Sequence, residues 1–242
     1  MSKFNFRNFS IDQSNSPLKV GTDAILLGAC IEIAEDTTSI LDVGTGTGVV
    51  AMILASRFKN VHVSAVEPNE QAFFMASQNF KNAPFAERLT LFSTPIEAFE
   101  SNILFDVVVS NPPYFIDGLK SLNPDMKQAK HLYEHAFFAF IDASLSYLKD
   151  SGLFWLILPK PLAETVSKYL CSKGLKQVHK TRFHSNLQKL DIRWVLAFSK
   201  NENKPNENDD SLNCHELFIR NTDGSFHQDY INLAGYLHAK NL

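Results

Sequence analysis

The sequence predicts an α/β fold whose strands form one mostly parallel, doubly wound sheet. Short apolar, β-branched runs alternate along the chain with longer segments whose apolar residues recur at helical spacing. Such alternation is typical of βαβ units, in which helices join parallel strands and cover both faces of the sheet. Two later runs are separated only by a short polar loop, which favours one antiparallel pairing. We therefore expect seven strands, one of them antiparallel, with helices on both faces.

The elements follow one another with short connections. Residues 4–11 alternate apolar and polar side chains, which predicts a short strand or hairpin arm, and Thr22-Asp23 provides a helix start. The expected strands of the sheet cover residues 39–43, 61–66, 88–92, 106–110, 152–159, 175–184 and 191–199, with a last strand fragment at 217–219. The expected helices cover residues 24–33, 49–58, 70–80, 134–148, 161–171 and 230–238, with a helical turn at 95–99. Residues 117–128 lack a regular pattern and predict a long loop beside the site.

Length and composition indicate one sizeable domain. The chain has 242 residues, of which 45% are hydrophobic, and we expect a single domain over residues 1–242. Within it, residues 1–35 are expected to form an N-terminal extension with a capping helix, and residues 201–213 a flexible polar surface loop. The formal net charge of -3 excludes a globally basic nucleic-acid binder, so any such surface must be a local patch. We expect no metal, because the three cysteines are far apart in the sequence. We expect a cytoplasmic location, because no apolar run reaches membrane-spanning length. We also expect a monomer.

A glycine-rich turn, Gly44-Thr45-Gly46-Thr47-Gly48, lies between an expected strand and an expected helix. A dinucleotide fingerprint requires a glycine where this chain has Val49. Asp42, at the end of the preceding strand, would repel a pyrophosphate but would attract a sulfonium or ammonium cation. The turn therefore favours S-adenosylmethionine, with Glu67 of the next strand end accepting its ribose hydroxyls. A dinucleotide site and a purely structural turn remain alternatives.

A second motif, Asn111-Pro112-Pro113-Tyr114, follows the expected strand at 106–110. Two prolines after a strand fix a stiff loop at its carboxyl end, where open α/β sheets bind ligands. Its amide, its carbonyl before a proline and its aromatic ring suit a planar amine, with two acceptors for the N–H bonds and a stacking surface. The alternative is a strand-ending turn with a packed tyrosine. Because both motifs end strands of one sheet, we expect an amine site beside a methyl-donor site.

The sequence resembles the class I methyltransferases that carry an Asn-Pro-Pro-Tyr motif, and more closely the tRNA1(Val) (adenine-37-N6)-methyltransferase family. The residues that carry the resemblance are 19–23, 26–29, 41–48, Glu67, 111–115, 129–131 and 230–237. It implies a Rossmann-like fold, S-adenosylmethionine as cofactor, a tRNA substrate, and methylation of adenine N6 in a flipped base. Two departures are Ser93-Thr94, where the family often has an acid, and Lys130, where it has an arginine.

These considerations give three groups of expected site residues. The catalytic group is Asn111, Pro112, Pro113 and Tyr114. The cofactor-binding group is Thr22, Asp23, Asp42, Gly44, Thr45, Gly46, Gly48, Glu67, Thr94 and Asn111, although capping of the helix is an alternative role for Thr22 and Asp23. The substrate-binding group is Phe115, Lys130, His131, Lys180 and Arg182. Lys180 and Arg182 belong to a basic stretch at 173–200 with interleaved aromatic residues, which suits an RNA backbone; an exposed edge strand bearing protective lysines is the alternative.

Other functions share parts of this pattern. The same loop chemistry methylates glutamine amides in termination factors, adenine in DNA, or a ribosomal RNA base. The short N-terminus disfavours the first and the lack of a base-reading domain disfavours sequence-specific DNA methylation. A nucleotide-binding module without catalysis is disfavoured by the intact Asn111 and Glu67. A dinucleotide oxidoreductase would bind NAD in preference to S-adenosylmethionine.

Overall fold

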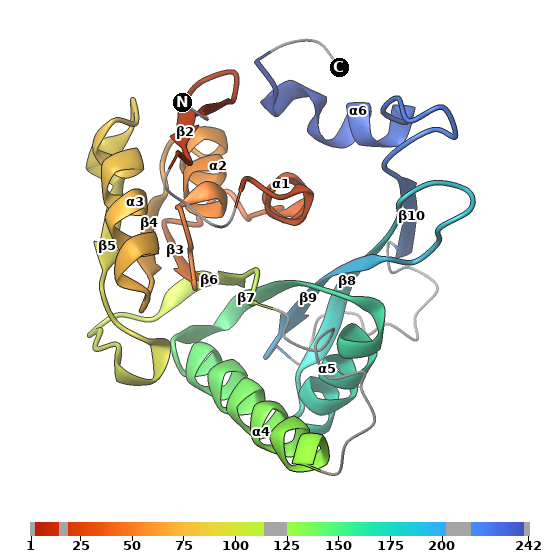
Figure 1. Ribbon diagram of the computed structural model, residues 1–242. Helices are drawn as coiled ribbons and strands as arrows, with labels where there is room; N and C mark the ends of the chain where they lie inside the picture. The colour runs from red at the N-terminus through yellow and green to blue at the C-terminus, as the bar shows by residue number, and fades with distance from the viewer. Residues whose placement is uncertain (1–2, 15–18, 114–124, 202–213, 240–242) are drawn as a thin grey trace.

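A computed structural model describes residues 3–14, 19–113, 125–201 and 214–239, with side chains from 134 onward in the third of these ranges and from 215 onward in the fourth. Its centre is one sheet with the strand order β10-β8-β9-β7-β6-β3-β4-β5 (Figure 1). All neighbours in it pair in parallel except β9, which is antiparallel to both β7 and β8. This confirms the expected mostly parallel sheet with one antiparallel strand.

The helices and strands follow one another in the predicted order. The strands are β1 Lys3–Asn5, β2 Ser10–Asp12, β3 Ser39–Val43, β4 His62–Val66, β5 Leu89–Phe92, β6 Phe105–Ser110, β7 Leu148–Leu158, β8 Lys176–His184, β9 Arg193–Ser199 and β10 Cys214–Phe218. The α-helices are α1 Thr22–Cys30, α2 Val49–Arg57, α3 Glu70–Lys81, α4 Asp125–Ser146, α5 Lys160–Ser172 and α6 Gln228–Ala234. Short 3-10 turns are η1 Ala86–Arg88, η2 Ile96–Ala98 and η4 Gly235–Leu237.

Four expectations need correction. The sheet has eight strands because the expected fragment near 217–219 begins earlier and pairs as β10 in parallel with β8. Helix α4 begins at Asp125, so residues 125–128 are helical and not part of the expected loop. Helix α1 has Gly21 as its N-cap with no side-chain cap hydrogen bond, so Thr22 and Asp23 do not cap it. Strand β8 is interior because β9 and β10 flank it, which makes the protected-edge interpretation of its lysines wrong.

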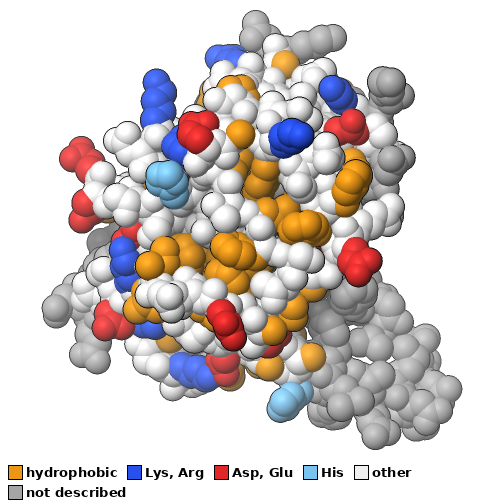
Figure 2. Space-filling model, turned by 90° about the vertical axis from the view of Figure 1, so that its left-hand side faces the viewer, with side chains coloured by type: hydrophobic (Ala, Val, Ile, Leu, Met, Phe, Trp, Pro, Cys, Tyr) orange, Lys and Arg blue, Asp and Glu red, His pale blue; other side chains and the backbone are white. Residues whose placement is uncertain are grey.

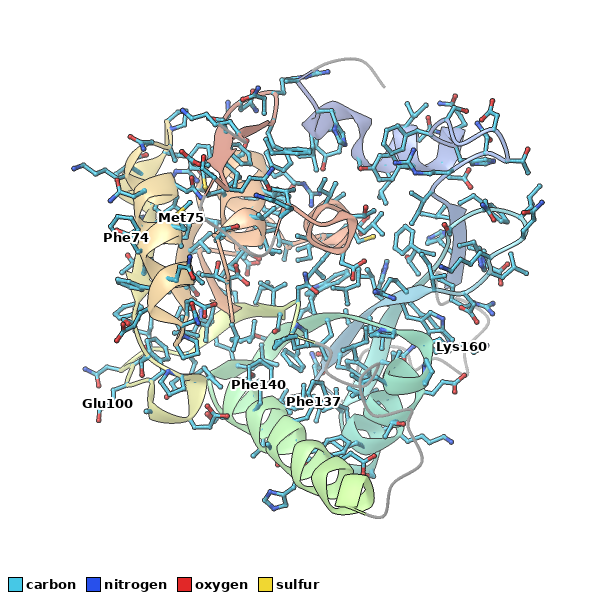
Figure 3. All side chains as sticks on the ribbon, in the orientation of Figure 1. Phe74, Met75, Glu100, Phe137, Phe140 and Lys160 are labelled. Atoms are coloured by element: carbon cyan, nitrogen blue, oxygen red, sulfur yellow. The ribbon has the colours of Figure 1, made fainter. Side chains whose placement is uncertain are left out.

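The sheet separates two apolar cores. Helices α1, α2 and α6 cover one face, and α4 and α5 cover the other (Figure 1). On the second face Phe137 and Phe140 rise from α4 toward the sheet (Figure 3). At the β5 end of the molecule, hydrophobic side chains also reach the surface among charged ones (Figure 2), including the exposed Phe74 of α3 and Phe92 of β5. No described helix has the length and apolar character needed to cross a membrane.

The two ends of the described chain meet on the α1 face. The N-terminal hairpin of β1 and β2 is joined to the C-terminal turn, because the backbone N–H of Arg7 donates to Leu237 O at 2.8 Å. Phe6 and His238 form a β-bridge, and the hydroxyl of Tyr230 lies 3.0 Å from His238 Nε2. The expected buried face of the terminal helix is confirmed by the near-complete burial of Tyr230 and Ala234.

Gly48 provides a test of how the glycine turn is packed. Its φ is +89°, and a Cβ there would lie 2.5 Å from Phe80 Cε1, a ring buried in the core. Gly174 has a similar φ of +87°, and nothing lies within 4 Å of the position that a Cβ would take. A substitution by alanine there therefore measures the cost of the backbone conformation alone. We expect Gly174→Ala to lower the free energy of unfolding by about 1–2 kcal/mol, and Gly48→Ala to lower it by about 1–3 kcal/mol more through overpacking. Urea unfolding measures both, and equal losses would contradict the packing account.

Candidate active site

Strand register brings the two sequence motifs to adjacent positions on one rim of the sheet. Val43, the last residue of β3, pairs with Val66 of β4 on one side and with Ser110 of β6 on the other. The next residues along these strands are Gly44, Glu67 and Asn111. The glycine turn and the double-proline loop therefore begin side by side, about one strand spacing or 4.8 Å apart.

A side-chain hydrogen bond reinforces this junction. The hydroxyl of Ser110, fully buried, donates to Val43 O at 2.7 Å. The bond crosses between β6 and β3 at the last residue of each, so the starting points of both loops are fixed relative to one another. Because the Ser110 hydroxyl has no access to water, loss of the hydrogen bond to Val43 O would leave a buried donor unsatisfied.

The glycine turn folds back onto β4 and presents an open backbone surface. The N–H groups of Gly44 and Thr45 both donate to Val66 O, at 2.9 and 3.1 Å. Gly44 and Gly46 have φ values of +72° and +59°, and nothing lies within 4 Å of the position that a Cβ would take on either. The turn therefore requires glycine for its conformation and leaves room for a ligand to approach the main chain.

Glu67 connects the turn to the next helix. Its Oε2 accepts the N–H of Gly46 at 2.8 Å and its Oε1 accepts the N–H of Asn69 at 2.9 Å. The side chain is buried, and Asn69 is the N-cap of α3, accepting the N–H of Ala72 at 2.9 Å. A carboxylate has about four lone-pair sites, so each oxygen of Glu67 retains acceptor capacity for a further donor.

Asp42 lies beneath the turn and is almost fully buried. Its Oδ2 accepts the hydroxyl of Thr45 at 2.6 Å and the N–H of Ala51, in the first turn of α2, at 3.1 Å. Burial raises the pKa of the Asp42 carboxyl to about 7, and the charge of Glu67 adds to the rise, while the two hydrogen bonds oppose it. The site thus contains a carboxyl that titrates near neutrality and that a nearby cation would hold ionised.

The start of α1 is tied to the antiparallel strand. The Nε of Arg193, at the beginning of β9, donates to Asp23 Oδ2 at 2.7 Å, and both side chains are only partly exposed. Because β9 runs against its neighbours, Arg193 lies at the same rim as Asn111. From sequence alone, Arg193 is only one of the basic residues of 173–200; its partner lies 170 positions away, and no local pattern marks that pairing.

The remaining expected residues fall into two groups. Pro112 is buried, Asn111 is half-buried and Pro113 is exposed. Thr94 follows β5 at the same rim and its hydroxyl donates to Pro95 O at 3.2 Å. The second group cannot be placed: Tyr114 and Phe115 lie outside the described residues, and Lys130 and His131 lie in α4 where the side chains are not described.

Lys180 and Arg182 occupy alternate positions of β8 and therefore the same face of the sheet. Lys180 Nζ lies 4.5 Å from the ring centre of Trp194, and Arg182 forms an ion pair of 2.5 Å with Glu216 of β10. Three strand spacings, about 14 Å, separate β8 from β6. The structure thus groups cations and an indole on the half of the sheet next to the double-proline loop.

A cavity of about 470 Å³ lies elsewhere, at the opposite rim of the sheet. Its lining includes Arg57, the last residue of α2, and Phe6 and Leu237 from the two chain ends. Because α2 begins at the glycine turn and ends here, the length of that helix separates the cavity from the candidate active site.

The chain is similar to known methyltransferases in sequence and in fold. The family model described as methyltransferase small domain matches residues 14–181. The chain is 38% identical to a Pedobacter heparinus protein named tRNA1(Val) (adenine(37)-N6)-methyltransferase, over 80% of this chain and 82% of the relative. A Histophilus somni protein of the same name is 34% identical, over 85% and 86%. The crystal structure of a predicted O-methyltransferase from Agrobacterium tumefaciens superposes with a TM-score of 0.63 over 90% of this chain and 98% of that one; at 18% identity this shows the fold alone.

The raised pKa of Asp42 makes a prediction about stability. Because the folded protein holds this proton more tightly than the unfolded chain, the carboxyl stabilises the fold below about pH 4, and the stabilisation is lost as the pH rises to 7. We expect the free energy of unfolding of the wild type, relative to Asp42→Asn, to fall by about 1.4 kcal/mol per pH unit across that window and to be level above it. Urea unfolding from pH 4 to 8 tests this, and a constant difference would contradict it.

Proposed function

The chain belongs to the methyltransferase small domain family and, within it, to the tRNA1(Val) (adenine(37)-N6)-methyltransferases, and on that basis we propose that it transfers a methyl group from S-adenosylmethionine to N6 of an adenine in tRNA. The observation that carries the proposal is the register that sets the glycine turn beside the Asn111 loop. By its relatives' names, the target is adenine 37 of tRNA1(Val). Because the substrate is a tRNA, we also propose a cytoplasmic location, and we expect the protein to be a monomer.

The residues of the turn fit the cofactor. S-adenosylmethionine supplies, when bound, an activated methyl group on a sulfonium centre. The open backbone at Gly44 and Gly46 accommodates close approach, and the spare lone pairs of Glu67 suit ribose hydroxyls. Both protein hydrogen bonds to Asp42 fall on Oδ2; within the described residues Oδ1 accepts none, which suits an added cationic donor. Asp23 and Thr94, at the same rim, are proposed as further contacts.

Asn111 and Pro112 provide the means to orient an amine. The Asn111 side-chain oxygen and the Pro112 carbonyl oxygen would accept the two N–H bonds of adenine N6. The nitrogen lone pair, which is otherwise delocalised into the ring, would then point to the methyl group. Such a displacement depends on alignment more than on a strong base, so a catalytic histidine is not required. Tyr114 and Phe115 are proposed to stack on the flipped base.

Cations of the neighbouring strands are proposed to hold the RNA backbone. Lys180 and Arg182 share one face of β8, and Lys160 begins α5 on that side of the sheet (Figure 3). Contacts of cations with phosphates supply most of the salt-dependent affinity of nucleic-acid binders. Lys130 and His131 are proposed as additional phosphate contacts near the beginning of α4.

Substitution of Asn111 tests the proposed chemistry. We expect Asn111→Ala to lower kcat by about 100-fold or more, the usual loss when one preorganised hydrogen-bonding group is removed from an active site. The dissociation constant for S-adenosylmethionine, measured by calorimetry, is expected to change less than twofold. Transfer of labelled methyl groups to bulk tRNA from a strain that lacks the gene, followed by nucleoside mass analysis, gives both the rate and the product.

Asn8→Ala is the control for this experiment, since Asn8 lies exposed at the opposite rim. Labelling of protein glutamine or of DNA in place of tRNA would overturn the substrate assignment. Methylation by Asn111→Ala at near the wild-type rate would overturn the assignment of the amine site.

The basic face of β8 predicts a salt-dependent phenotype. We expect Lys180→Gln/Arg182→Gln to weaken tRNA binding and to make the slope of log K against log salt concentration less negative by about 1–2, one for each phosphate that the variant no longer neutralises. The control is Lys59→Gln, because Lys59 is exposed just beyond α2 at the opposite rim. Filter binding at several salt concentrations measures the slopes, and unchanged affinity at low salt would exclude this surface.

A further inference from the structure

The turn between β8 and β9, residues 185–192, presents two large apolar side chains to solvent. Leu187 is 69% exposed and Leu190 is 57% exposed. Single exposed leucines are common on protein surfaces, so their exposure alone has no functional meaning. Leu187 and Leu190 differ from such leucines in their position on the sheet, in the hydrogen bonds that hold their turn, and in the charges around it.

The turn lies on the catalytic rim of the sheet. Strand β8 runs parallel to β6, because both are related through the antiparallel β9 to β7, which is parallel to β6. The end of β8 therefore reaches the same rim as Asn111. Arg193, the first residue of β9 after the turn, lies two strands from β6, about 10 Å across the sheet, and about 10 Å beyond the level of Ser110 along the strands, because Leu196 is the β9 residue level with Ser110. This is within the reach of a nucleotide adjacent to one held at Asn111.

Hydrogen bonds hold the tip of the turn in one shape. Asn186 Oδ1 accepts the N–H groups of Gln188 and Lys189 at 3.0 and 2.9 Å. The N–H of Ser185 donates to Lys189 O at 2.9 Å, and the N–H of Lys189 donates to Asn186 O at 3.2 Å. Leu187, which lies between the bonded residues, is consequently displayed at the tip.

The base of the turn is braced through Asp191. Among the described non-glycine residues, Asp191 alone has a positive φ, of +58°, a conformation that persists where the surroundings enforce it. Its N–H donates to His184 Nδ1 at 2.7 Å, and its carboxylate accepts the indole N–H of Trp194. Lys160 Nζ lies 2.7 Å from its Oδ2. The leucines are thus carried on a rigid support.

The charges around the turn favour a polyanion. Lys189 lies between the two leucines in sequence, and its ammonium forms no ion pair with the described residues. Three acids near the turn are each held by a cation at 2.5 to 2.7 Å: Asp191 by Lys160, Glu216 by Arg182 and Asp23 by Arg193. Each of these ion pairs carries no net charge, so none of the three acids leaves an unbalanced negative charge beside the turn.

We propose that Leu187 and Leu190 contact the faces of the nucleobases that flank the target adenine and support the RNA strand once that adenine has left its stack. The proposal rests on the proposed function. Extrusion of a base carries an unstacking cost, and apolar side chains inserted at a base step are a general way to offset it. The Arg193–Asp23 ion pair fixes the turn relative to α1, and hence relative to the cofactor side of the site.

The test compares two matched double variants. Leu187→Ser/Leu190→Ser removes both apolar side chains from the turn. Ile103→Ser/Leu104→Ser removes two leucine-sized side chains, 56% and 48% exposed, just before β6 and therefore at the opposite rim. Leu187→Met/Leu190→Met retains apolar contact. Each protein is assayed for kcat/KM on tRNA, for the dissociation constant of S-adenosylmethionine, for Tm, and for the fluorescence of 2-aminopurine placed at the target position of an RNA.

We expect Leu187→Ser/Leu190→Ser to lose at least about tenfold in kcat/KM, equivalent to one unstacking contact of about 1.4 kcal/mol, and to lose the fluorescence rise that reports unstacking. Tm and cofactor affinity should stay at wild-type values. The Leu187→Met/Leu190→Met and Ile103→Ser/Leu104→Ser variants should retain the wild-type kcat/KM and the wild-type fluorescence rise. A serine variant within twofold of wild type in kcat/KM and fluorescence would overturn the proposal, as would a wild-type dimer that the serine variant dissociates.

Failure of the proposed function would be separately visible. If the wild type transfers no methyl group to any tRNA, the function assignment fails. The fluorescence measurement then still decides the role of the turn: a rise with the wild type but not with the serine variant supports base contact, and no rise with either overturns it.

Discussion

The pairing of β3 with β6 is the constraint on which the site depends. It places Val43 against Ser110, and the buried Ser110 hydroxyl locks the last pair through Val43 O. A shift of one residue would turn every side chain of β6 to the other face. Such a shift would break the buried Ser110 hydrogen bond and would force side chains of other sizes into the close-packed cores on both faces, so it is strongly disfavoured. The separation of the glycine turn from the double-proline loop is thus fixed by core packing.

Most of the fold could be predicted because it is encoded in local patterns. The five-residue run at 39–43 and the glycines after it specify a strand and a turn without help from distant residues. The sequence predicts a strand fragment at 217–219, but the bounds of β10 and its place as the eighth strand of the sheet could not be predicted, because β10 is short, follows a polar low-complexity stretch, and pairs with the distant β8. The beginning of α4 was not predicted because residues 117–128, taken together, show no regular pattern, although the helix already begins at Asp125.

The positions of the candidate site residues at the ends of neighbouring strands could be predicted, but the hydrogen bonds and ion pairs that connect them could not. The acids at strand ends were found from their position, yet the sequence does not reveal that Asp42 is buried enough to titrate near neutrality. Nor does the sequence reveal that the hydroxyl of Thr45 already donates a hydrogen bond to the carboxylate of Asp42. The Asp23–Arg193 ion pair and the braced leucine turn join segments far apart in the chain, and their geometry follows only from the tertiary fold.

The meeting of the two chain ends has a practical consequence. Phe6 and His238 are bridged on the α1 face, beside the cavity at the rim remote from Asn111. A short peptide could join the exposed Lys3 and Ala239 without crossing the rim that carries Asn111, and domains tolerate such circular permutation when the joined residues lie together at the surface. The same arrangement means that a reporter joined at Lys3 or at Ala239 would lie away from the rim that carries Asn111.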